Sequence, residues 1–97
     1  MTEKERIIAL LKNETVSCYA IEKMSDGRIA AANVRRYRKG LATDEPFDCK
    51  RATKVANMKE TTAQVFLEIF EEVERVNPTN KAEVRSMVHR YIAKKRE

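Results

Sequence analysis

The scarcity of helix-breaking residues limits the folds open to this chain. Only two glycines and two prolines occur among its 97 residues, and tryptophan is absent. Alanine, glutamate, lysine and arginine, which favour helices, are frequent. With 42% hydrophobic and 36% charged residues, the chain can form one small core. We therefore expect an all-α fold, a compact bundle of five or six short helices in a single domain spanning residues 1–97.

Capping residues predict where the helices begin. Thr2 with Glu5 predicts a capping box at the first helix, Ser17 is a good N-cap for the second, and Asn80 with Glu83 is expected to cap the last. The expected helices cover residues 2–13, 17–24, 30–39, 47–58 and 61–76, with a sixth from residue 80.

Turn residues predict where the helices end. The sequence Ser25-Asp26-Gly27 is the strongest turn signal, and Gly40 is expected to end the third helix as a left-handed C-cap. Thr61 and Gln64 form a possible second capping box, which favours a break near residue 60. One continuous helix over 47–76 is the alternative.

Apolar residues at helical spacing predict the core. The expected core residues are Ile7, Ile8, Leu11, Tyr19, Ala20, Ile21, Met24, Ile29, Val34, Tyr37, Phe47, Ala52, Val55, Ala56, Val65, Phe66, Ile69, Phe70, Val73, Val76, Val84, Met87, Val88, Tyr91 and Ile92. The segment 61–76 carries apolar residues on more than one side, while Glu68, Glu71, Glu72 and Glu74 are expected to face outward. Its second partner is expected to be either the core or another subunit.

Several functional classes lack their sequence signals. No apolar run approaches the roughly 20 residues of a membrane span, and the N-terminal stretch is too charged for a signal peptide, so a cytoplasmic protein is expected. Cys18 and Cys49 are expected to be reduced, and with His89 they have no metal-ligand spacing. No phosphate loop, dinucleotide fingerprint or catalytic arrangement is present. We expect no enzyme activity, no cofactor and no metal.

Positive charge is concentrated in two blocks. Residues 17–43 carry six basic and two acidic side chains, and residues 81–97 have the same balance. The segment 61–80 between them has one basic and four acidic side chains, and the whole chain has a net charge of +5. Clustered arginine and lysine are typical of proteins that bind polyanions.

The first positive block contains two short expected helices joined by a glycine-containing turn, over residues 17–40. This arrangement describes a helix-turn-helix. Small side chains at Ala30, Ala31 and Ala32 would let the second helix enter the major groove of DNA, although they would also suit close helix packing. Arginine can bind guanine, and asparagine adenine, through two hydrogen bonds.

The end of the second of these helices reads Val34-Arg35-Arg36-Tyr37-Arg38-Lys39-Gly40. It resembles the recognition helix of phage-repressor-type helix-turn-helix domains (the lambda repressor and Xre-like group), whose pattern is roughly Ile-Ser-Arg-Trp/Tyr-x-x-Gly. The resemblance implies that Val34 and Tyr37 pack inward. It also implies that the following residues face DNA: Ala31, Ala32, Asn33, Arg35 and Arg36.

Two further stretches are similar to the same family. The run from Ser17 to Ile21 is similar to the start of the family's first motif helix, whose N-terminal end touches a phosphate, and residues 47–56 resemble the helix that closes its core. Two features depart from the pattern. Glu22 stands where the family has a small residue, and the turn is about two residues longer.

These observations predict a sequence-specific protein that binds double-stranded DNA, as a small bacterial, phage or plasmid transcriptional regulator such as a repressor. Asn33, Arg35 and Arg36 are expected to read bases. Four residues are expected to hold phosphates: Ser17, Arg28, Arg38 and Lys39. The alternative is a helical protein-interaction module or anti-repressor that grips a partner through the apolar residues of 65–76.

The remaining expectations concern assembly and individual side chains. Helix-turn-helix proteins often dimerise so that two recognition helices meet half-sites about 34 Å apart, and the pair of helices in 61–97 is expected to form a homodimer. Tyr19 and Tyr37 are expected in the core rather than stacked on bases, and His89 at the surface or an interface. The sequence Lys94-Lys95-Arg96 is either a frayed tail or an extra phosphate contact.

Overall fold

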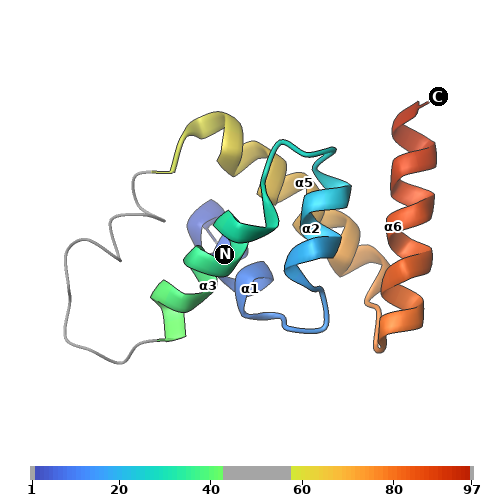
Figure 1. The fold of residues 1–97 in the computed structure, drawn as a ribbon, viewed down its shortest axis with the longest axis horizontal. Helices are drawn as coiled ribbons and strands as arrows, with labels where there is room; N and C mark the ends of the chain where they lie inside the picture. The colour runs from blue at the N-terminus through green and yellow to red at the C-terminus, as the bar shows by residue number, and fades with distance from the viewer. Residues whose placement is uncertain (1, 43–57, 97) are drawn as a thin grey trace.

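A computed structural model describes residues 2–42 and 58–96. These residues form helices joined by loops (Figure 1). The five helices are α1 (Glu3–Lys12), α2 (Cys18–Met24), α3 (Ala31–Ala42), α5 (Glu60–Val76) and α6 (Lys81–Arg96). No strand occurs in these residues, which confirms the all-α expectation. The expected helix over 47–58 lies outside the described residues except for Met58, which is not helical.

The three expected caps are present. At α1, the Glu5 N–H donates to the Thr2 hydroxyl at 3.2 Å, and the Thr2 N–H donates to the Glu5 carboxylate at the same distance. The Ser17 hydroxyl accepts from the Ala20 N–H at 3.0 Å, and the Asn80 side chain accepts from the Glu83 N–H at 2.9 Å. These bonds satisfy N–H groups that have no partner within their own helix.

One predicted helix end and one predicted cap were wrong, whereas the expected break near residue 60 is confirmed. α3 continues through Gly40 to Ala42, because Leu41 packs against the core and extends the buried side of the helix. α5 begins at Glu60 after Lys59, which makes no side-chain cap, so the expected capping box of Thr61 and Gln64 does not start it. The non-helical residues 58–59 also exclude a continuous helix over 47–76. Asn77, in the left-handed conformation with φ of 49°, ends α5 where expected.

The helices pack around one core. α2 lies between α3 and α6, and α1 packs against α5 and α3 (Figure 1). The most deeply buried side chains come from all five helices and the loops: Leu10, Leu11, Val16, Ile21, Met24, Val34, Phe66, Ile69 and Met87. The expected stripe on α6 is confirmed, with Val84, Met87, Val88 and Tyr91 buried and Ile92 half-buried.

α5 uses its apolar residues inside the protein. Val65, Phe66, Leu67, Ile69 and Val73 are all buried, because α1 covers α5 and α6 also contacts it. The second partner of this wide apolar surface is therefore the protein's own core. These residues are not open to a binding partner.

Glu72 was expected to face outward, and that expectation was wrong. It is only 9% exposed. Arg75, one turn along α5, donates two hydrogen bonds to its carboxylate, one of them from Nε at 3.3 Å. A buried charge is tolerated when it is paired and hydrogen-bonded in this way.

One ion pair joins α6 to α5, and the other charged contacts of α6 are local. Lys95 donates to Glu68 of α5 at 2.9 Å, and its Nζ lies 4.8 Å from the centre of the Tyr91 ring. Tyr91 and then Glu68 raise the pKa of Lys95 above its ordinary value. At the start of α6, hydrogen bonds from the Thr79 N–H and hydroxyl lower the pKa of Glu83.

None of the described helices is long and apolar enough to cross a membrane.

The turn between α2 and α3 is organised around Ser25. Its side chain is buried, and its hydroxyl donates to the Glu22 carbonyl at 2.7 Å while accepting from the Ile29 N–H at 3.1 Å. Asp26 and Gly27 both have positive φ, 56° and 78°. Glycine adopts this conformation without strain, which explains why the chain reverses at the expected place.

We expect Ser25→Ala to lower the free energy of unfolding by about 1–2 kcal/mol, because the Ile29 N–H would lose its acceptor inside the protein. Urea unfolding followed by circular dichroism measures the change. Ser86→Ala, at an exposed position on α6, is the matched control and should change stability by less than about 0.5 kcal/mol. Equal effects of the two substitutions would contradict a structural role for the Ser25 hydroxyl.

Candidate nucleic-acid interface

α3 presents a basic outer face. Val34 and Tyr37 orient the helix, because Val34 is fully buried and the Tyr37 ring meets Phe66 edge-on, with ring centres 5.8 Å apart and an angle of 87°. Tyr37 is half-buried, so its expected place against the core is confirmed. The opposite face is exposed to solvent and consists of Ala32, Asn33, Arg35, Arg36 and Lys39.

The exposure of the alanines at the start of α3 distinguishes between access to a DNA groove and close helix packing, the two interpretations that the sequence left open. Ala30 and Ala32 are exposed, and Ala31 is half-buried. Close packing against another helix therefore does not account for Ala30 or Ala32. These small side chains leave the backbone of the first turn of α3 accessible from outside.

Ser17 and Arg28 lie outside α3, and Arg28 is three residues before it in the chain. Ser17 is exposed at the N-terminus of α2, which packs directly on α3. Arg28 is exposed in the turn before α3 and borders a shallow hollow with Thr61 and Thr62 of α5. Of the residues expected to contact DNA, only Ala31 and Arg38 are not exposed.

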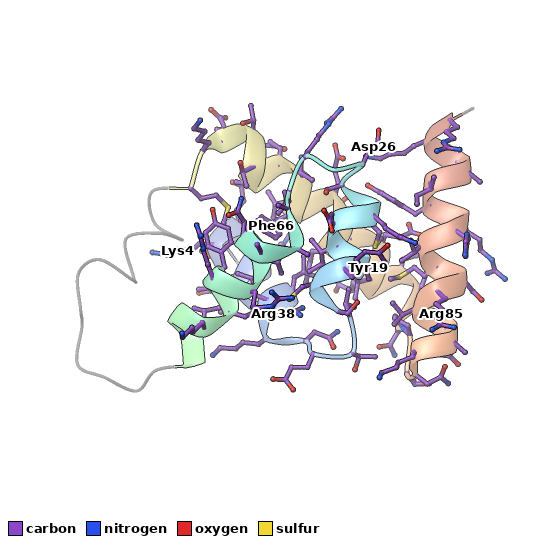
Figure 2. All side chains as sticks on the ribbon, viewed as in Figure 1. Lys4, Tyr19, Asp26, Arg38, Phe66 and Arg85 are labelled. Atoms are coloured by element: carbon purple, nitrogen blue, oxygen red, sulfur yellow. The ribbon has the colours of Figure 1, made fainter. Side chains whose placement is uncertain are left out.

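Arg38 lies on the inner side of α3, half-buried beside the loop between α1 and α2 (Figure 2). Its guanidinium donates to the carbonyl oxygens of Leu11 at 2.7 Å, Asn13 at 3.2 Å and Val16 at 2.5 Å. A fourth contact reaches the Cys18 sulfur at 3.5 Å. We call these four contacts the Arg38 clamp. The clamp binds α3 to the chain that enters α2, so this guanidinium is engaged inside the protein.

The clamp is the main feature of the region that the sequence analysis missed. Arg38 was grouped with its neighbours because all of them are basic. Its position four residues after the buried Val34 was the available signal, since residues i and i+4 share one face of a helix. Its partners are backbone carbonyls, which have no signature in the sequence.

Tyr19 was expected in the core, and that expectation was wrong. It is 60% exposed, and the Lys23 Nζ lies 4.8 Å from its ring centre. The buried side of α2 is formed instead by Ala20, Ile21 and Met24. The ring therefore stands on the same outer side of α2 as Lys23, one turn further along.

Chemistry that depends on metals has no site in the described residues, where no group of three or more potential ligands comes together. Cys18 is a free, half-buried thiol in contact with Arg38. Cys49 lies outside the described residues. The features that stand out are thus the basic outer face of α3 and the exposed N-terminus of α2 beside it. Comparisons of the chain with protein-family models, with curated proteins and with solved structures found no match.

Proposed function

We propose that the protein binds double-stranded DNA in a sequence-specific manner and acts as a small transcriptional regulator, with α3 in the major groove. The observation that carries the proposal is the exposed face of α3, which combines Arg35, Arg36 and Asn33 with small side chains at its N-terminal end. Arginine and asparagine are the side chains that bind guanine and adenine edges through paired hydrogen bonds. No acidic residue interrupts this face, because α3 contains none.

The surroundings of α3 support the same proposal. Ser17, Arg28 and Lys39 are exposed around the helix, where they would hold backbone phosphates on either side of the groove. Arg38 is not part of this set, since its donors are engaged in the Arg38 clamp. The clamp would instead fix the angle between α2 and α3, and a fixed angle reduces the entropy lost when both helices meet a duplex.

The proposal includes a homodimer. A single copy offers two arginines and one asparagine for reading bases, which is a small set for discriminating one site among many. Two copies related by a twofold axis would read an inverted repeat with half-sites about one helical turn apart. The apolar face of α5 is buried, so the contact between copies would have to use other surfaces.

Selection of bound fragments from random duplex DNA tests the proposal. We expect enrichment of an inverted repeat whose half-sites contain guanine. Arg28 and Lys39 from two copies make four phosphate contacts. These predict a slope of log affinity against log salt near −3.6 and a roughly hundredfold loss between 50 and 200 mM salt. Absence of any enriched sequence at low salt, or affinity that does not change with salt, would refute the proposal.

A further inference from the structure

A groove of about 550 Å³ runs between α2 and α6, on the side of α2 away from α3. Its volume falls within the range of about 300–1,000 Å³ that is usual for binding pockets. Figure 2 labels Tyr19 on α2 and Arg85 on α6, which lie on its two sides. None of the residues proposed to read bases, Asn33, Arg35 and Arg36, lines this groove, although Ser17, proposed to hold a phosphate, does.

The α6 side of the groove consists of two parallel rows. Val84, Val88 and Ile92 are spaced four residues apart and form an apolar row, and Lys81, Arg85 and His89 form a second row with the same spacing. Residues at this spacing lie above one another on a helix face. From the first to the last of these residues the rows span about 16 Å, or three helical turns.

The α2 side adds two apolar residues and one lysine. Ala20 and the exposed Tyr19 ring continue the apolar floor, and Lys23 stands at the edge with its ammonium group over the Tyr19 ring. Glu14, from the preceding loop, is the one acidic side chain in the lining. The groove is therefore an apolar strip about three turns long, with Lys81 and Arg85 along its α6 edge and Lys23 on the α2 edge.

We infer that this groove binds an acidic amphipathic helix of a partner protein. An amphipathic helix buries apolar residues at positions i, i+3, i+4 and i+7 in such a groove. Acidic residues flanking that stripe would meet Lys23 on one edge and Lys81 and Arg85 on the other. The cationic side chains thus select acidic residues on the flanks of the partner helix, and the apolar floor selects apolar residues along its middle.

Two other occupants fit less well. A duplex backbone carries negative charge but has no apolar face to cover the exposed Tyr19 ring and the half-buried Ile92. A second copy of the chain would have to supply its acidic helix α5, whose apolar residues are buried in its own core. Of the three, only a separate acidic amphipathic segment matches both the floor and the edges.

The test uses the full chain and two fluorescent 15-residue helical peptides with the same leucine stripe. One peptide has glutamates beside the stripe and the other has lysines. We expect the glutamate peptide to bind at least about tenfold more tightly in fluorescence anisotropy at 50 mM salt. Lys81→Glu with Arg85→Glu should reverse this preference, because the edge would then attract the lysine peptide. Both residues are exposed, so the variant should fold.

Arg90→Glu with Lys94→Glu is the matched control, since these exposed residues of α6 do not line the groove. It should change peptide affinity by less than about twofold. Equal binding of the two peptides, or no binding of either at 1 mM, would overturn the inference. A duplex of random sequence and a sedimentation run complete the test. Loss of DNA binding or of dimers in the Lys81/Arg85 variant, without an effect on peptides, would assign the groove to DNA or to a second copy instead.

This result is separable from the proposed function. Peptide binding does not require DNA, and the Arg35 and Arg36 side chains lie on α3, outside the groove. Failure of the peptide experiment would leave sequence-specific DNA binding unaffected, and failure of the DNA selection would leave the groove as a protein-binding site.

Discussion

Arg35→Ala combined with Arg36→Ala should abolish specific DNA binding while the protein stays folded. Each arginine that grips a guanine through two hydrogen bonds contributes about 1–3 kcal/mol to discrimination, and the double substitution removes four such arginines from a dimer, so binding to the selected site should weaken by roughly a thousandfold or more. Both side chains are exposed, and within residues 2–42 and 58–96 neither makes a hydrogen bond or ion pair that holds α3 in place. Competition between the selected duplex and a scrambled duplex, followed by fluorescence anisotropy, measures the loss of specificity.

A control with the same change in charge separates base reading from general attraction to a polyanion. Arg90→Ala with Lys94→Ala also removes two positive charges, on exposed positions of α6. It should lower affinity for both duplexes by a similar small factor and leave their ratio unchanged. Circular dichroism spectra and unfolding curves of both variants should match those of the parent. An unchanged ratio in the Arg35/Arg36 variant would defeat the assignment of α3 as the reading helix.

Arg38→Ala should destabilise the fold by about 2–4 kcal/mol, far more than any substitution on the outer face of α3. The substitution removes the whole Arg38 clamp, and hydrogen bonds from charged donors are among the stronger ones in proteins. Because the half-buried loop carbonyls would recover part of this energy from water, the estimate is well below the sum of the separate bonds. The melting temperature should fall by roughly 10–30 °C, as measured by thermal unfolding.

Arg38→Lys and Arg36→Ala are controls that show whether the loss of stability comes from the contacts of the Arg38 guanidinium. A lysine retains the charge but lacks the planar fork that reaches several carbonyls at once, so Arg38→Lys should keep less than half of the stabilisation. Arg36→Ala removes a neighbouring arginine from the exposed face and should change the unfolding free energy by less than about 0.5 kcal/mol. If Arg38→Ala were as mild as Arg36→Ala, the clamp would have no importance for stability.

Local signals in the sequence were sufficient for most of the secondary structure. The caps at Thr2, Ser17 and Asn80 depend on side chains within three residues of the N–H that they satisfy, so a short stretch contains all the information. The same holds for the turn at Gly27. Where tertiary packing decided the outcome, the prediction failed. Leu41 reaches the core and carries α3 past Gly40, although a glycine there is the usual signal for a helix end.

The candidate interface was predictable only as far as helical periodicity extends. Buried Val34 and half-buried Tyr37 define the inner side of α3, and the outward position of Arg35 and Arg36 follows from that spacing. Arg38 could not be separated from them by residue type, because its partners come from a loop more than 20 residues earlier. The exposure of Tyr19 was not predictable for a related reason. Which side of α2 is buried depends on its packing against α6, a helix that lies far along the chain.

Three of the four contacts of the Arg38 clamp are to main-chain oxygen atoms, and every amino acid supplies the same oxygen. The half-buried Asn13 can therefore be exchanged without removing the carbonyl that Arg38 binds, whereas position 38 admits no substitute with an equivalent reach. In a library of random variants selected for folding, exchange should be tolerated at Asn13, Glu14 and Thr15 and at the exposed Arg35 and Arg36, but not at Arg38.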